Sequence, residues 1–210
     1  TTMKKLNLVM SFFPAMMLMI LIFFLPSRVN AQDKGTFTDS RDGRVYTWVK
    51  TGNQAWMAEN LKYAAKAECW IYNDDSTKLD YFGRLYSWKA AQTACPKGWH
   101  LPSDKEWGVL FQSLGGSGEA GAKIQSWDTI AKIKNTSTEP NASTMSSLFG
   151  GVRHADGSSI GLNFWGGCWS SNKTNETESN NVLFVHGAKA LGLSTNDSKA
   201  GFSVRCIRNK

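Results

Sequence analysis

The sequence has 210 residues and a formal net charge of +7, from 24 basic and 17 acidic side chains. Three of the basic residues and none of the acidic ones precede residue 32, so residues 32–210 carry a net charge of only +4. The basic residues of this part are scattered among acids and never form a run of five, which argues against a nucleic-acid partner.

The first 31 residues have the three parts of a secretory signal peptide. Lys4-Lys5 gives a basic start, an apolar run extends from Leu8 to Leu25, and Val29-Asn30-Ala31 supplies a small-residue cleavage site. A membrane anchor is the alternative, because the run is near the shortest length that spans a bilayer. Two prolines in and after the run favour cleavage. We therefore expect an exported protein (periplasm, cell surface or medium), without stable membrane insertion, whose residues 32–210 form a single domain.

All four cysteines follow the predicted cleavage site, at Cys69, Cys95, Cys168 and Cys206. An even number of cysteines in an exported chain indicates two disulfides, and four cysteines allow three pairings. No two of them have the C-x-x-C spacing of a zinc site. We expect no metal at the cysteines.

Two elements are predicted in the first half. Residues 44–58 alternate in the manner of two strands, joined by a tight turn at Thr51-Gly52-Asn53. Residues 81–95 place Leu85, Trp88 and Ala91 at helical spacing, and Pro96 follows as a stop. The pattern predicts a hairpin followed by a first helix.

A second helix is predicted from Ser103 onward. Ser103 and Glu106 have the spacing of a capping box, in which each side chain bonds the backbone amide of the other residue. Apolar residues follow at i, i+3, i+4 and i+7, and two glycines end the pattern; they are Trp107, Leu110, Phe111 and Leu114.

The second half is predicted to be loops and strands. Gly, Ser, Thr and Asn dominate from residue 115 to 146, which indicates a long loop region. Strand-like stretches follow at 149–153, 162–170, 182–186 and 202–207. Helices followed by strands predict an α+β fold.

Six blocks follow one another along the chain: G-N-Q-A-W-M-A-E-N-L (52–61), Y-F-G-R-L-Y-S-W-K-A-A (81–91), C-P-K-G-W-H-L-P-S-D-K-E-W (95–107), L-F-G-G-V-R (148–153), W-S-S (169–171) and G-F-S-V-R-C (201–206). Together they resemble the Fibrobacter succinogenes major paralogous domain, a family of exported bacterial proteins that looks like a divergent branch of the C-type lectin fold. The resemblance implies two helices, small antiparallel sheets and a long loop region.

The resemblance also implies disulfides. In C-type lectin-like domains a cysteine that closes the first helix pairs with one on the last strand, which corresponds to Cys95 and Cys206. The two remaining cysteines, Cys69 and Cys168, then form the second expected pair.

Sugar-binding C-type lectins hold calcium with Glu-Pro-Asn in the long loop and Trp-Asn-Asp on the next strand, and Glu139-Pro140-Asn141 matches the first motif. The second is incomplete, because Trp169 is followed by Ser170-Ser171-Asn172 without an acid. We therefore expect no cofactor, with calcium at Glu139 and Asn141 as a minor alternative.

An enzyme is not expected. The chain has no G-x-S-x-G, H-E-x-x-H or P-loop motif, and its histidines, His100, His154 and His186, are far apart. His100 is expected to be a buried structural residue. Formylglycine-generating enzymes and their relatives use a related fold, but they need reactive cysteines or clustered histidines. An enzyme of the formylglycine-generating type is therefore the least favoured hypothesis.

We expect the late strands and loops to face a ligand, because their composition provides adaptable polar contacts on a rigid support. Five tryptophans in the family blocks are expected in the core instead: Trp48, Trp56, Trp88, Trp99 and Trp107. The leading hypothesis is a binding or surface module for a glycan or a protein, and the alternative is a structural subunit of a surface assembly. The candidate ligand-facing residues are Trp165, Trp169, Asn172, Asn175, Asn181, His186 and Asn196.

Overall fold

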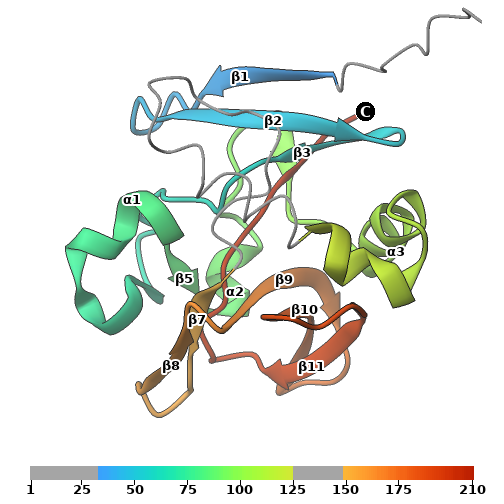
Figure 1. Cartoon of the computed structure of the whole chain (residues 1–210). Helices are drawn as coiled ribbons and strands as arrows, with labels where there is room; N and C mark the ends of the chain where they lie inside the picture. The colour runs from blue at the N-terminus through green and yellow to red at the C-terminus, as the bar shows by residue number, and fades with distance from the viewer. Residues whose placement is uncertain (1–32, 125–148) are drawn as a thin grey trace, which may run out of the picture. The chain divides into compact units, whose positions relative to one another are not determined.

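The computed structural model describes residues 33–124 and 149–210, which belong to one compact unit that spans Gln32–Lys210 (Figure 1). The predicted signal peptide and the predicted calcium ligands, Glu139 and Asn141, lie outside the described residues. Within the described ranges, no helix combines the length and the apolar character needed to cross a membrane.

The first five-stranded sheet joins the two ends of the unit. Its order is β1-β2-β3-β12-β6, and every neighbouring pair is antiparallel. The predicted hairpin is confirmed, with its turn at Gly52, where φ is 59°. The C-terminal strand lies between β3 and β6 and so returns to the front half of the chain. The strands are β1 Lys34–Thr38, β2 Val45–Thr51, β3 Gln54–Met57, β6 Trp99–His100 and β12 Ile207–Arg208.

The second five-stranded sheet is built from the late strands, in the order β11-β10-β9-β7-β8. Only the β7–β9 pair of this sheet is parallel. A two-stranded sheet pairs β4 (Cys69–Trp70) with β5 (Leu85–Tyr86). Sheets and separate helices confirm an α+β fold. The late strands are β7 Gly150–Arg153, β8 Ser159–Leu162, β9 Trp165–Lys173, β10 Glu178–Val185 and β11 Leu193–Asp197.

The predicted helix over 81–95 is wrong in its extent. The chain forms α1 (Leu79–Phe82), then β5, then the single turn α2 (Trp88–Ala91). The break occurs at Gly83, which has φ of 76° and packs so closely that a Cβ atom would lie 2.8 Å from a backbone oxygen. Backbone pairing of Tyr86 with Phe202 then holds the following residues extended. Two 3-10 turns precede α1, at Tyr72–Asp74 and Ser76–Lys78.

The second predicted helix is confirmed as α3 (Asp104–Ser113), with both hydrogen bonds of the capping box between Ser103 and Glu106. Its apolar face packs into a core with β10. The ring centroids of Trp107 and Trp56 are 4.6 Å apart. A second core lies between the first sheet and β9. Of the five tryptophans expected in the core, Trp56, Trp99 and Trp107 are buried, whereas Trp48 and Trp88 are partly buried.

One of the two predicted disulfides is present. Cys95 and Cys206 are bonded, with Cα atoms 5.9 Å apart. The predicted bond between Cys69 and Cys168 is wrong, because both are free thiols. Cys168 belongs to the core beside α3, whereas Cys69 packs against the other core. The two sulfur atoms therefore lie in different parts of the domain and do not meet.

We expect the double variant Cys95→Ser, Cys206→Ser to have a free energy of unfolding lower by about 4 kcal/mol, because the bond closes a long loop. The sequence separation of the two cysteines is 111 residues. Denaturant titration measures the loss. Cys69→Ser is the control and should change the midpoint far less; equal losses in both proteins would contradict the stabilising role of the disulfide.

Candidate functional site

The seven residues predicted to face a ligand do not form one surface. Trp169 and Asn181 are fully buried, so their predicted role is wrong. The indole of Trp169 donates to the carbonyl oxygen of Tyr86 at 2.7 Å and packs on Phe202, with ring centroids 4.7 Å apart. The central part of β9 is covered on both faces, so alternation along this strand does not expose every second side chain.

Trp165 and His186 lie together at one end of the β9–β10 pair. Trp165 is opposite Val185 in the antiparallel register, and the amide of His186 donates to the carbonyl oxygen of Phe164 at 2.9 Å. The ring centroids of Phe164 and His186 are 6.4 Å apart. We call Phe164, Trp165 and His186 the aromatic corner.

The aromatic corner is exposed on a fixed backbone. The exposed fractions are 67% for Phe164 and 45% for Trp165, the highest among the Phe, Trp and Tyr side chains of the described residues. Gly161 lies against the Trp165 side chain, and a Cβ atom at Gly161 would be 2.8 Å from the Cβ of Trp165. Glycine at this position therefore lets the end of β8 pass close to the Trp165 side chain. The sequence pattern does not single out Phe164, although its position beside Trp165 is a signal.

The predicted asparagines lie at the opposite end of the hairpin and bond within the protein. The side-chain oxygen of Asn172 accepts the Asp104 amide at 2.9 Å. The side-chain oxygen of Asn175 accepts the amides of Thr177 and Glu178, each at 2.9 Å. Asn196 donates to the buried Asn181 side chain at 3.2 Å. These amides shape the hairpin and do not join the aromatic corner.

Asp104 fastens this end of the hairpin to α3. One carboxylate oxygen accepts the Ser170 hydroxyl at 2.5 Å, and the other accepts the side-chain amide of Asn180 at 2.6 Å. A carboxylate in the first turn of a helix is also favoured by the helix dipole. The polar end of the late strands is therefore a structural joint.

His100 is not buried as predicted, since its side chain is 41% exposed, but both ring nitrogens are engaged. One contacts Asn209 at 2.7 Å and the other contacts Glu106 at 2.8 Å. Burial opposes ionisation of Glu106, yet bonds from Ser103 and His100 outweigh it, so the pKa of Glu106 is lowered. His100 thereby ties the C-terminal end of the chain to α3.

Neither free thiol is an activated nucleophile. Burial raises the pKa of Cys168 to about 11, although the nearby Arg205 guanidinium opposes the shift. Burial also raises the pKa of Cys69. Across residues 33–124 and 149–210, no three His, Cys, Asp or Glu side chains come together to hold a metal ion.

Residues 49–208 match the family model described as the Fibrobacter succinogenes major domain. The chain belongs to this family. No curated protein and no solved structure matches the chain. The matched range includes the aromatic corner, the Asp104 joint and the disulfide of this Fibrobacter major domain.

We expect Cys69 and Cys168 to react slowly with thiol reagents in the folded protein at pH 8, because a raised pKa leaves little thiolate. A colorimetric thiol assay should detect both free cysteines after unfolding without reductant. Cys69→Ser separates the two signals. Fast native labelling of the remaining Cys168 would contradict its burial.

We expect Glu106→Gln to lower the free energy of unfolding by about 1 kcal/mol at pH 7, because the capping box and the His100 contact are weakened. The folded-state pKa of Glu106 is lowered, so its ionisation stabilises the fold above the unfolded-state pKa. This contribution disappears as pH falls through the folded-state pKa.

Stability measured between about pH 7 and pH 3 should therefore fall less steeply in the variant than in the unaltered protein. Glu176→Gln, at an exposed carboxylate in the β9–β10 turn, is the matched control. Identical slopes in all three proteins would contradict the role of Glu106.

Proposed function

We propose that this protein is an exported, non-enzymatic binding module with a C-type lectin-like fold, and that it recognises a glycan at the aromatic corner. One observation carries the proposal: Phe164 and Trp165 are adjacent, exposed aromatic residues at the start of β9, a strand whose next five residues are buried. Among the described residues, most other large aromatic side chains are in the two cores or pack against them.

A glycan fits this surface because a sugar ring has apolar C–H faces and polar hydroxyl edges. Aromatic rings cover the apolar faces, and a few polar groups fix the orientation. The imidazole of His186 supplies such a group next to Phe164. A protein ligand would use the same rings as anchors, so the test must separate these two classes.

The support beneath the corner favours binding without reorganisation. Trp165 is the first residue of β9 and pairs with Val185, the last residue of β10. Its backbone therefore belongs to the antiparallel β9–β10 pair. Side chains that are already ordered lose less conformational entropy on binding. Aromatic side chains on a fixed backbone can therefore retain a small ligand that makes few contacts.

Three features support a C-type lectin-like arrangement. The two ends of the domain share one sheet, the Cys95–Cys206 bond joins the end of the first helical region to the residue before the last strand, and the late strands form a separate sheet. A binding role rather than catalysis is supported by the raised pKa of both free thiols and by the engaged nitrogens of His100.

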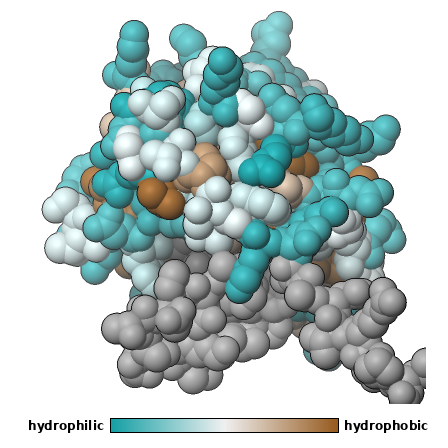
Figure 2. Space-filling model, turned by 90° about the horizontal axis from the view of Figure 1, so that it is seen from above, coloured by the Kyte–Doolittle hydropathy of each residue, from teal (hydrophilic) through white to brown (hydrophobic). Residues whose placement is uncertain are grey.

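A structural subunit remains the second candidate, favoured by the edge strands β1 and β11. Unpaired strand edges can pair with another chain. Figure 2 shows the face above β1 and β2, where hydrophilic residues surround small, separated apolar areas. Such a face lacks the broad apolar patch typical of obligate assemblies.

A glycan array probed with residues 32–210 tests the proposal, with and without EDTA. We expect retention on a subset of glycans, and we expect Phe164→Ala and Trp165→Ala each to weaken it about tenfold. Val45→Ala is the control, because Val45 is an exposed apolar residue, at 61%, in the other sheet.

Loss of binding in EDTA would identify calcium, for which Glu139 and Asn141 are the sequence candidates. Absence of any glycan signal, together with self-association in sedimentation experiments, would overturn glycan recognition and favour the structural subunit. Binding that survives in both aromatic variants would move the site elsewhere.

A further inference from the structure

A cavity of about 390 Å³ lies on a part of the molecule that shares no residue with the aromatic corner. It is bounded by the segment before β2, by residues 63–68 and by the helical region of α2. This volume is within the range of small-molecule sites. Its lining residues are Arg41, Tyr63, Ala65, Lys66, Ala67, Glu68, Lys89, Ala90 and Thr93.

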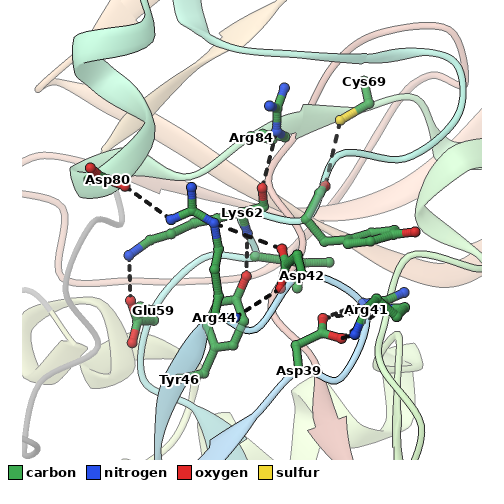
Figure 3. Close-up of polar contacts among 12 residues, drawn as sticks. Asp39, Arg41, Asp42, Arg44, Tyr46, Glu59, Lys62, Cys69, Asp80 and Arg84 are labelled. Carbon is green, nitrogen blue, oxygen red and sulfur yellow. Dashed lines mark hydrogen bonds and ion pairs between the residues drawn. The ribbon is translucent and has the colours of Figure 1, made fainter.

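The Arg41 guanidinium is held in a fixed orientation at this cavity. Its Nε and Nη2 atoms donate to the Asp39 carboxylate, at 2.9 and 2.7 Å for the shortest contacts (Figure 3). The Cζ atom of Arg41 lies 3.7 Å from the centre of the Tyr63 ring. Nη1 makes no hydrogen bond within the described part of the chain, and the side chain is 26% exposed. A preoriented donor is therefore available to a ligand.

Both members of the Asp39–Arg41 pair are charged in the folded protein. Burial opposes their ionisation, but the hydrogen bonds and the mutual attraction are stronger, so the pKa of Asp39 is lowered and that of Arg41 is raised. The Asp39 side chain is fully buried, so a ligand meets the guanidinium rather than the carboxylate.

Two lysines add positive charge to the cavity. Lys66 and Lys89 are exposed, and neither forms an ion pair with any residue that the structure describes. Glu68 is the one acid among the lining residues, and its carboxylate accepts the Ser87 hydroxyl at 2.6 Å. Ser87 in turn caps α2 by accepting the Ala90 amide. Glu68 thus links residues 63–68 to the start of α2 through Ser87.

The charges of the cavity suit a single negative charge. Three cationic side chains and one acid line it, which gives +2, and the buried Asp39 behind Arg41 reduces the local sum to +1. The remaining walls are the Tyr63 ring, three small alanine side chains and Thr93. A ligand therefore needs one anionic group attached to a compact body that can pack against methyl groups.

We propose that this cavity binds a carboxylate-bearing sugar, such as a hexuronate unit of an acidic glycan, with the carboxylate at Arg41, Lys66 and Lys89. A hexuronate has one negative charge, a ring of suitable size and hydroxyl groups that the Thr93 side chain can bond. The site is independent of the aromatic corner, so either site can exist without the other.

Titration of ¹⁵N-labelled protein with glucuronate, followed by amide chemical shifts, tests the site. We expect saturable shifts in residues 65–68 and 89–93, with a dissociation constant of about 1 mM, as befits a ligand of this size. Glucose at the same concentration should leave these signals in place, because it lacks the charge.

The double variant Lys66→Gln, Lys89→Gln should weaken glucuronate binding about tenfold, since it removes two exposed charges without touching the core. The double variant Lys97→Gln, Lys105→Gln is the matched control: both lysines are exposed, and the change in net charge is the same. Trp165→Ala should not alter these shifts, which separates this site from the aromatic corner.

Equal shifts with glucose and glucuronate would overturn the role of charge. Equal weakening of glucuronate binding in the two lysine variants would show that only the overall charge of the protein matters. That result would also overturn the site. Shifts of residues 65–68 and 89–93 with a short acidic peptide but not with glucuronate would assign the cavity to a peptide carboxylate and reject the sugar.

Discussion

The buried contact between Arg205 and Asn60 is the interaction on which the rest of the domain depends. Arg205 is fully buried, and its guanidinium donates to the Asn60 side-chain oxygen at 2.7 and 3.2 Å and to the Ala58 carbonyl oxygen at 3.2 Å. A buried cation without such partners would be strongly destabilising. Asn60 also donates to Ser203, so the C-terminal segment can occupy only one register against residues 58–60.

That register positions the late strands. The C-terminal segment runs from the second sheet to the first (Figure 1), bonding Arg153 through Gly201, β9 through Ser203 and β3 through Cys206. The Cys95–Cys206 bond fixes its far end. Because β9 is clamped between this segment and β10, only its first residue, Trp165, projects into solvent as a large aromatic side chain. Trp165 is exposed because it lies at the end of this covered stretch.

Features set by neighbouring residues could be predicted from the sequence, whereas features set by distant partners could not, apart from the Cys95–Cys206 bond that the family resemblance implied. The capping box of α3 and the turn at Gly52 depend on a few consecutive residues. The 81–95 helix failed because a tight contact at Gly83 and a backbone pairing with Phe202 override its helical spacing. Trp169 was expected at the surface because nothing local reveals that β9 is covered on both faces.

The charge pattern shows the same difference between local and spatial information. Scattered basic residues argue against nucleic acid, because a polyanion is bound by a continuous row of cations. A single carboxylate needs only a few cations around one cavity, and Arg41, Lys66 and Lys89 meet there from separate parts of the sequence. Asp39 accepts hydrogen bonds from Arg41, and Glu68 accepts one from Ser87. The fold therefore brings three cationic side chains together and also partly offsets their charge with two carboxylates. A modest net charge is therefore compatible with a selective anion site.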